Sequence, residues 1–492
     1  MADRLSAADT AFLYAQDAVT PMHVGGVVIL EPAAGVDYDR IARHIAERLP
    51  LVPRYRQKVR LVPARLARPV WVDDEDFDLT YHVRRSALPK PGNDSQLDDL
   101  VGRLISRPLD THRPLWEMYV VEGLSGGRVA IVNKTHEALV DRLGAVDLAA
   151  AILDVAAAPD RDNGDAWIPH PAPSNADLVI DAVTDLTARP TEVLDVLRLA
   201  AVDLTSTIGR VNELVGGVAG IVRQTVSPAP RSALGVASTG QRRFARYAAA
   251  LDDFRAIRTA HEGTVNDVVL TVLAGALRSW LLSRGEPVTD ATSIRALVPM
   301  SVRSGGETAP VTSYLVELPV AEPNPVMRLH QVVFATRAHA ESGRQVRADA
   351  LVALGRYTPP TLHALGARVG FTLSRRSYNV LVTNVPGPQI PLYVAGSQVL
   401  AMYPVAPLVR GHALAVACTS YRGKVYYGLT ADRVAMSDVE EFAVLLDEAV
   451  TELKDTVPGV RRRVQKTPKS QQAPKSQQAP RSQQAPRTGE RE

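Results

Sequence analysis

The sequence predicts an α/β protein built from two domains. Short apolar runs that are typical of buried strands alternate with helical segments along most of the chain. With 492 residues, the chain is too long for a single hydrophobic core. A stretch rich in Pro, Asp and Asn at 156–175 indicates a linker. We therefore expect a first domain over 1–155, a linker with a long amphipathic helix over 156–240, a second domain over 241–455, and a basic, disordered tail over 456–492.

The first domain is predicted to alternate strands with helices. Strands are expected at 21–30, where two glycines interrupt an apolar run, at 77–83, where apolar and polar residues alternate, and at 128–132. Helices are expected at 38–49, which Pro50 and Pro53 end, at 95–106, and at 145–155.

The second domain shows the same alternation. A helix is expected at 265–282, strands at 293–299 and 379–383, and a hairpin from 413–420 to 424–430 that turns at 421–423. Residues 466–492 repeat a polar six-residue unit three times, and such a segment is too polar to bury a core.

The segment 176–225 is apolar and helical, with a break at Pro190. Over 191–223, apolar residues recur every three or four positions, which predicts one long amphipathic helix. One interpretation is that this helix packs on the two domains or bridges them. The other is that it rests on a membrane or a lipid droplet. Its mixed charges and lack of aromatic residues favour the first.

Composition excludes several function classes. The chain has 56 Lys and Arg residues and 53 Asp and Glu residues, so it lacks the strong basic excess that is typical of nucleic-acid-binding proteins. The single Cys418 excludes an intrachain disulfide and fits a reducing cytosol. The N-terminal sequence lacks the features of a signal peptide, and no apolar run approaches the ~20 residues of a membrane span. The expected location is cytoplasmic, with a peripheral position at the inner membrane or a lipid-droplet surface as the alternative.

The most informative segment is 133–144, Asn-Lys-Thr-His-Glu-Ala-Leu-Val-Asp-Arg-Leu-Gly. It follows a predicted strand and precedes a predicted helix, so His136, Glu137 and Asp141 lie at a junction where many folds expose reactive side chains. The segment resembles the HHxxxDG signature of the bacterial wax ester synthase/diacylglycerol acyltransferase family. His136 matches the first histidine and Asp141 the aspartate. Glu137 stands where the family has its general base, and Arg142 replaces the glycine.

Other blocks resemble the same family, in the same order along the chain. They are Leu5 to Asp9, Pro21 to Gly25, Phe77 to Val83, the PLWE box Pro114-Leu115-Trp116-Glu117, the ND motif at Asn266-Asp267, the loop Asn384-Val385-Pro386-Gly387-Pro388, and Gly428 to Arg433. The resemblance implies two chloramphenicol-acetyltransferase-like α/β sandwich domains with a channel between them. It also implies substrate-binding roles for Pro114, Trp116, Asn266, Asp267, Asn384, Pro386 and Gly387.

The reaction that the resemblance implies needs a base. A hydroxyl of pKa about 16 is a poor nucleophile at pH 7, so a base must take its proton as it attacks a thioester. Glutamate, with an ordinary pKa of about 4.3, is a weak base unless an apolar setting raises its pKa. His136 is adjacent, but neighbours on an extended segment point in opposite directions. The resemblance implies direct transfer without an acyl-enzyme, with Asp141 holding the loop. It also implies acyl-CoA as a co-substrate, and we expect neither a cofactor nor a metal.

The expected function is therefore acyl-CoA-dependent esterification of a lipid alcohol, diacylglycerol to triacylglycerol first and a long-chain alcohol to a wax ester second. Because of Glu137 and Arg142, a catalytically degraded homologue that binds acyl-CoA or lipid, or that regulates active relatives, remains the alternative. Transfer to another acceptor, such as an amine or a polyketide hydroxyl, is a third interpretation.

Purely structural roles compete with the proposed chemical roles at several positions. Asp141 is expected to form a salt bridge, for which Arg303 is a candidate partner. Asn266-Asp267 can cap a helix, and 384–388 can be a rigid Pro/Gly turn. His23 and His412 are expected to be structural.

Overall fold

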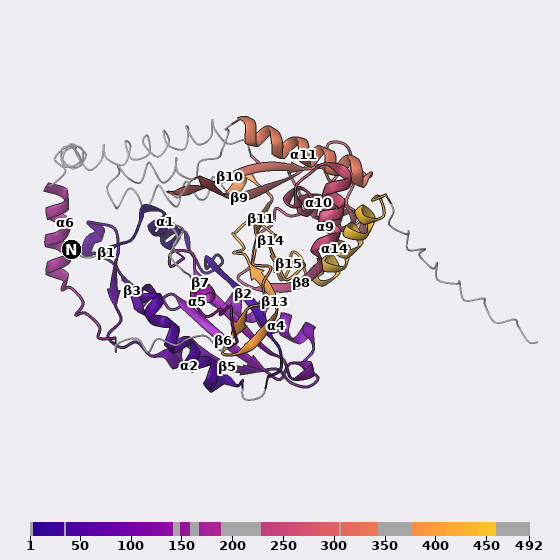
Figure 1. Ribbon diagram of the computed structural model, residues 1–492. Helices are drawn as coiled ribbons and strands as arrows, with labels where there is room; N and C mark the ends of the chain where they lie inside the picture. The colour runs from indigo at the N-terminus through magenta and orange to yellow at the C-terminus, as the bar shows by residue number, and fades with distance from the viewer. Residues whose placement is uncertain are drawn as a thin grey trace, which may run out of the picture.

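The computed structural model describes residues 3–33, 36–140, 148–157, 167–187, 228–304, 307–342 and 375–458. It contains two six-stranded sheets, one built mainly from the first half of the chain and one from the second, and a small three-stranded sheet (Figure 1). The predicted helix 191–223, the tail 466–492, Asp141 and Arg142 lie outside the described residues, and so does the side chain of Arg303.

The sheet of the second half has the strand order β10-β9-β11-β14-β15-β8. Its strands are β8 (Arg242–Ala250), β9 (Ile294–Ser304), β10 (Glu307–Leu318), β11 (Val380–Val385), β14 (Leu414–Tyr421) and β15 (Lys424–Asp432). The helices of this half are α9 (Leu251–His261), α10 (Val265–Ser283), α11 (Pro325–Ser342) and α14 (Val439–Lys454). All four contribute to one large apolar core with the sheet (Figure 1). The predicted helix, strands and hairpin of this half are confirmed within a few residues.

Helix α10 is the central element of that core. Thr264 and Asp267 form a reciprocal capping box at its start, which satisfies two backbone N–H groups that would otherwise lack partners. In the described part of the chain, α10 alone is long and apolar enough to cross a membrane, and 72% of that stretch is buried inside the protein. Its hydrophobicity is therefore that of a core helix.

The sheet of the first half has the order β12-β13-β2-β7-β6-β5. Its strands are β2 (His23–Leu30), β5 (Val83–Ala87), β6 (Trp116–Glu122), β7 (Val129–His136), β12 (Tyr393–Val394) and β13 (Ser397–Val405). The small sheet is made of β1 (Asp3–Arg4), β3 (Gln57–Arg60) and β4 (Val70–Asp73). The helices of this half are α1 (Ala7–Ala15), α2 (Tyr38–Arg48), α3 (Leu79–His82), α4 (Asp94–Ser106), α5 (Leu148–Ala151) and α6 (Asn175–Thr187). The helices predicted at 38–49 and 95–106 are confirmed.

The strand predicted at 77–83 is wrong. Asp78 accepts a hydrogen bond from the backbone N–H of Thr80 and caps the short helix α3, so that strand β5 begins only at Val83. An apolar residue at every second position is compatible with a single helical turn when a cap precedes it. The ring of His82 then stacks between Phe77 and Trp116, at 5.2 and 4.6 Å.

The second half of the chain contributes strands to the first sheet. Strand β13 comes from the second half of the sequence but pairs antiparallel with β2, and it extends the first sheet (Figure 1). It also crosses β15 so closely that a Cβ atom at Gly428 would lie 1.7 Å from the carbonyl oxygen of Pro404. Only glycine allows that approach. The ranges 1–155 and 241–455 are therefore not two self-contained units.

Two buried arginines of β8 also join the halves. Arg242 donates to the carbonyls of Val19 and Leu408 and lies 3.7 Å from Asp432, which is fully buried. Arg246 forms an ion pair with Asp98 of α4, although the guanidinium is only 5% exposed. Because a buried charge without a partner is costly, these contacts fix how the halves sit together.

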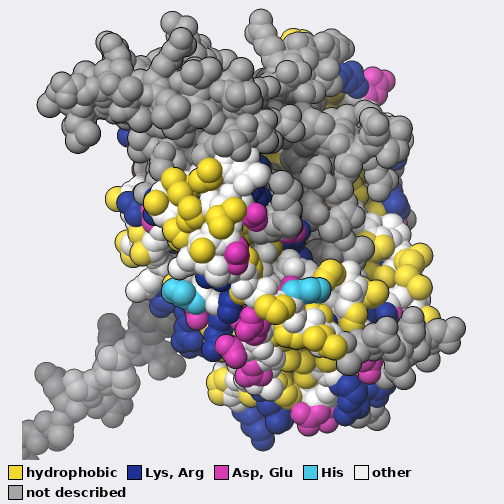
Figure 2. All heavy atoms as spheres, turned by 90° about the vertical axis from the view of Figure 1, so that its left-hand side faces the viewer, with side chains coloured by type: hydrophobic (Ala, Val, Ile, Leu, Met, Phe, Trp, Pro, Cys, Tyr) yellow, Lys and Arg dark blue, Asp and Glu magenta, His cyan; other side chains and the backbone are white. Residues whose placement is uncertain are grey.

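The face that carries α6 and the small sheet is chemically mixed. Figure 2 shows hydrophobic side chains there beside clusters of both signs of charge. Exposed apolar side chains in these elements and the loops next to them include Leu61, Leu66, Ile180 and Val183.

Candidate active site

Three of the sequence blocks meet at the end of strand β7. His136 is the last residue of β7 and pairs with His23 of β2. Its backbone N–H donates to the carbonyl of Leu115 in the PLWE box, at 3.0 Å. The N–H of Glu137 donates to the carbonyl of Met22, also at 3.0 Å. The backbone therefore brings the N-terminal block, the PLWE box and the His-Glu pair into direct contact.

The side chain of His136 is completely enclosed. Its Nδ1 accepts a hydrogen bond from the backbone N–H of Ala138 at 3.0 Å, so the imidazole proton is on Nε2. Burial lowers the pKa of His136 to about 4. The imidazole is therefore neutral at pH 7, and its lone pair on Nδ1 is already used. This geometry suits a group that holds the turn 137–140 in place better than one that takes a proton from a substrate.

The enclosed His136 predicts an acid-sensitive fold. The unfolded chain binds a proton at this histidine below pH about 6.5, whereas the folded chain does so only below about 4. Stability is therefore complete above pH 6.5 and is lost as the pH falls from 6.5 to 4, by about 3 kcal/mol for this group. Urea unfolding across this range should show that loss in the wild type and a shallower pH slope in His136→Gln. The exposed His112 provides a control, since His112→Gln should keep the wild-type slope. Equal slopes in all three proteins would contradict the assignment.

Burial also lowers the pKa of His23 well below its ordinary value, with the nearby Lys134 as the next cause. The rings of His23 and His136 meet edge to face at 6.4 Å. His23 is thus a buried neighbour of His136, and its structural role stays a prediction. His412 is buried as well, stacked on Tyr378 at 4.4 Å.

Glu137 begins the turn that follows β7, and its side chain is half-buried. Its backbone adjoins Met22, which lines a small cavity between the halves together with Arg242 and Leu408. Glu137 is therefore more accessible than the enclosed His136. Asp141, the third predicted catalytic residue, lies outside the described residues.

The PLWE box contacts the end of β7 through its backbone, and its glutamate forms a buried ion pair. Trp116 is 1% exposed, and its indole N–H donates to the carbonyl of Tyr55 at 2.7 Å, so the structure places it in the core rather than against a substrate. Pro114 is buried as well. Glu117 faces Lys134 across the two strands, with an ion-pair distance of 2.8 Å between side chains that are 7% and 1% exposed.

The second half contributes an asparagine pair. The Nδ2 of Asn384, in β11, donates to the Oδ1 of Asn266 at 3.2 Å, and the Nδ2 of Asn266 donates to the hydroxyl of Tyr314 at 3.0 Å. Two residues for which the resemblance implies substrate-binding roles, Asn266 and Asn384, are therefore in contact. Asp267 does not join them. Its carboxylate accepts hydrogen bonds from Thr264 and, at 2.7 Å, from Thr336 of α11. Asp267 therefore caps the start of α10, which is the structural role that competes with substrate binding.

The loop after Asn384 is held rigidly against strand β14. A Cβ atom at Gly387 would lie 2.2 Å from the carbonyl oxygen of Ser420, so only glycine fits. The backbone N–H of Gly387 donates to the Ser420 hydroxyl at 3.2 Å, and the side chain of Gln389 donates to the same hydroxyl at 3.1 Å. Pro386 is exposed.

Sequence reasoning missed Tyr314 and Lys134. Tyr314 has no motif around it, and only the pairing of β10 with β9 brings it near α10 and β11. Lys134 lies two residues beyond the predicted strand 128–132, and only the longer observed strand β7 places it at a buried position, where a lysine needs an ion-pair partner.

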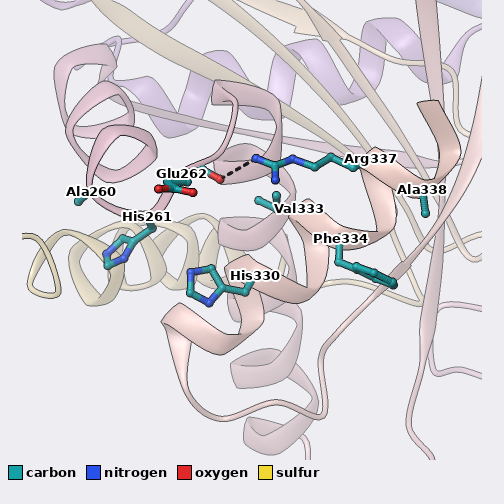
Figure 3. Close-up of a pocket in the computed structure, with 8 residues that line it drawn as sticks. All are labelled: Ala260, His261, Glu262, His330, Val333, Phe334, Arg337 and Ala338. Carbon is teal, nitrogen blue, oxygen red and sulfur yellow. Dashed lines mark hydrogen bonds between the residues drawn. The ribbon is translucent and has the colours of Figure 1, made fainter. Parts of the chain in front are cut away.

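A separate hollow lies on the surface of the second half. It is lined by side chains of α9 and α11, among them His261, His330 and Phe334, with Arg337 hydrogen-bonded to the carbonyl of Glu262 (Figure 3). It shares no residue with the strand-end site or with the asparagine pair.

Known proteins share this organisation. Residues 5–269 match the catalytic domain model of the wax ester synthase/diacylglycerol acyltransferase family, and residues 310–454 match its C-terminal domain model. A probable diacylglycerol O-acyltransferase of Mycobacterium tuberculosis, tgs1, is 32% identical over 465 residues, which cover 92% of this chain and 96% of that protein. Another from the same organism, tgs3, is 43% identical over 264 residues, which cover 53% of this chain and 97% of that protein.

Solved structures confirm the predicted fold class. A wax ester synthase/diacylglycerol acyltransferase from Marinobacter aquaeolei superposes with a TM-score of 0.65 at 28% identity, covering 92% of this chain and 99% of that one. The first condensation domain of the CDA synthetase has a TM-score of 0.53 at 14% identity, covering 93% and 97%, and shows the same fold. From the matched family models and the full-length relatives, the chain belongs to the wax ester synthase/diacylglycerol acyltransferase family.

Proposed function

We propose that this protein is an acyl-CoA-dependent O-acyltransferase that esterifies diacylglycerol to triacylglycerol, with Glu137 as its general base. Family membership and the names of the mycobacterial relatives support the reaction class and the acceptor. One observation carries the assignment of the base. At the end of β7 His136 is enclosed with its lone pair in use, whereas Glu137 is half-buried.

In the proposed reaction the carboxylate of Glu137 takes the proton of the acceptor hydroxyl. The oxygen attacks the thioester carbonyl and forms a C–O bond, and the resulting tetrahedral intermediate collapses with cleavage of the C–S bond. The carboxylic acid of Glu137 then returns the proton to the departing thiolate of coenzyme A. Atoms and charge balance without an acyl-enzyme. Acyl-CoA takes part as a co-substrate.

A turnover assay with the purified full chain tests this function. The reaction contains radiolabelled long-chain acyl-CoA and, separately, diacylglycerol, a long-chain alcohol and a long-chain amine, each presented in vesicles. We expect labelled triacylglycerol as the main product. A wax ester as the main product would keep the reaction class but change the acceptor, and an amide would favour the third interpretation.

One observation favours the alternative of a degraded homologue: Glu137 and Arg142 depart from the family motif. It predicts no turnover with any acceptor, although acyl-CoA or lipid still binds. Equilibrium binding of radiolabelled acyl-CoA to the same preparation distinguishes this outcome from an unfolded protein, which would not bind.

A further inference from the structure

A surface loop between the two large sheets exposes apolar side chains. It covers residues 385–391, Val-Pro-Gly-Pro-Gln-Ile-Pro, begins at the last residue of β11 in the second sheet and leads to β12 in the first. Val385 is 66% exposed and Ile390 is 53% exposed, and the three prolines of the loop are exposed as well. A single apolar residue on a surface is ordinary, but several in one short loop form a patch that indicates a contact.

The protein holds this loop in one shape along the hairpin of β14 and β15. In the middle of the loop, the side chain of Gln389 donates to the hydroxyl of Ser420 at 3.1 Å and accepts from the backbone N–H of Gly423 at 2.9 Å. Just after the loop, the backbone N–H of Leu392 donates to the hydroxyl of Tyr421 at 2.9 Å. The apolar side chains therefore stay at the surface although the loop is well anchored.

The turn of that hairpin is cationic. Arg422 and Lys424 are both exposed, and neither has an ion-pair partner within the described residues. The sequence contains no Asp or Glu from 378 to 431. The acids at the start of the adjacent helix α9, Asp252 and Asp253, each pair with another basic side chain, at 3.0 and 2.8 Å. The apolar loop thus lies beside two cations whose charge is not neutralised locally.

We infer that the loop 385–391, together with Arg422 and Lys424, is a docking surface for a bilayer that contains anionic phospholipids. The apolar side chains would enter the interface, while the guanidinium and ammonium groups contact the phosphates.

Two arguments select a lipid surface as the partner. The first rests on the proposed function, since diacylglycerol is dissolved in a bilayer. The second is size, because the loop and the turn offer far fewer residues than the roughly 20–30 that a protein–protein interface uses on each side. The exposed apolar side chains on the face that carries α6 suit anionic lipid less well, since charges of both signs lie beside them (Figure 2).

Co-sedimentation of the full chain with vesicles tests this surface. The wild type should bind equimolar phosphatidylglycerol/phosphatidylcholine vesicles more tightly than pure phosphatidylcholine vesicles. Arg422→Gln combined with Lys424→Gln should raise the dissociation constant for the anionic vesicles about 10- to 30-fold, the effect of two cations near an anionic surface. Ile390→Ser should raise it about 3- to 10-fold, through the loss of apolar contact.

Matched variants elsewhere on the protein control this experiment. Lys90→Gln combined with Arg103→Gln removes two exposed cations of the first half, and Leu282→Ser removes an apolar side chain that is 51% exposed. Both should bind the anionic vesicles as the wild type does. Equal losses in the test and control variants, no loss in either, or equal binding of the wild type to both kinds of vesicle would overturn the inference.

A fluorescent label reports the contact directly. Cys418, the one cysteine of the chain, is 1% exposed, so a cysteine introduced by Ile390→Cys can be labelled selectively with a polarity-sensitive dye. Its emission should shift to the blue when anionic vesicles are added, and nitroxide-labelled lipid should quench it. The same label introduced with Leu282→Cys should show neither change. If the label at position 390 keeps its aqueous emission while the protein sediments with vesicles, another surface binds the lipid and the inference is wrong.

Turnover separates a failure of this inference from a failure of the proposed function. With diacylglycerol in anionic vesicles at low concentration, the Arg422→Gln/Lys424→Gln variant should lose most of its turnover. With a short-chain diacylglycerol in solution, it should match the wild type. Equal losses with both acceptors would contradict a role at the lipid surface. If the wild type turns over neither acceptor, the proposed function fails, whereas sedimentation and the label still decide whether the surface binds lipid.

Discussion

Replacing Glu137 with glutamine is expected to lower kcat for triacylglycerol formation by about 10²- to 10⁴-fold, the usual contribution of a general base. The amide keeps the shape of the side chain but cannot accept a proton from the acceptor hydroxyl. The KM values should change little, because the loss concerns the proton transfer and not the binding of either substrate. The measurement is steady-state turnover with radiolabelled acyl-CoA and diacylglycerol.

Two variants control this experiment. Glu441→Gln changes an exposed carboxylate in the first turn of α14 and should keep full activity. Glu137→His introduces the residue that the family has at this position, and turnover should rise or stay the same. The assignment of the base fails if Glu137→Gln is as active as the wild type and as Glu441→Gln. Another group would then have to take the proton from the acceptor hydroxyl.

Replacing Glu117 with alanine is expected to destabilise the protein by about 3–5 kcal/mol, because a buried ammonium loses its counter-ion. The side chain of Lys134 is 1% exposed. Without Glu117 it would retain only the carbonyl oxygens of Leu104 and Arg107, at 3.4 and 3.1 Å. Burial already lowers the pKa of Lys134, and the loss of the Glu117 carboxylate would lower it further. The free energy of unfolding in urea is the measurement.

A neighbouring surface pair provides the matched control. Glu122 lies on the same strand and pairs with Arg85, whose side chain is 65% exposed, so Glu122→Ala should cost less than about 1 kcal/mol. Lys134→Met should cost less than Glu117→Ala, since Glu117 keeps Arg84 at 3.2 Å and the hydroxyl of Tyr119 at 2.8 Å. A loss for Glu117→Ala no larger than that for Glu122→Ala would contradict this account.

Local patterns in the sequence predict the elements that local forces determine. The helix at 265–282 was predicted within one residue at its end because its apolar residues and its capping residues are contiguous. The hairpin from 413 to 430 follows from two apolar strands around a short turn. The strand predicted at 77–83 failed because the same alternation fits a capped helical turn, and the cap of Asp78 decides between them.

Contacts between distant residues could not be predicted in the same way. The PLWE box is recognisable in the sequence as a block. The core position of Trp116 and the ion pair of Glu117 depend on the pairing of β6 with β7, which the sequence does not show. The resemblance implies substrate-binding roles for Asn266 and Asn384, but only the folded structure shows that the two side chains are in contact. Tyr314 was not expected, because nothing in its neighbourhood in the sequence indicates a polar role. The roles of Glu137 and Asp141 stay predictions.

The pairing of β13 with β2 has a consequence for the order in which the chain folds during synthesis. Strand β2 contains the apolar run Val27 to Leu30, and its outer edge is covered only by β13, which leaves the ribosome several hundred residues later. At about 5–20 residues per second, that edge stays open for tens of seconds. An open apolar edge is a template for pairing with another chain. A fragment that ends before β13 should therefore aggregate.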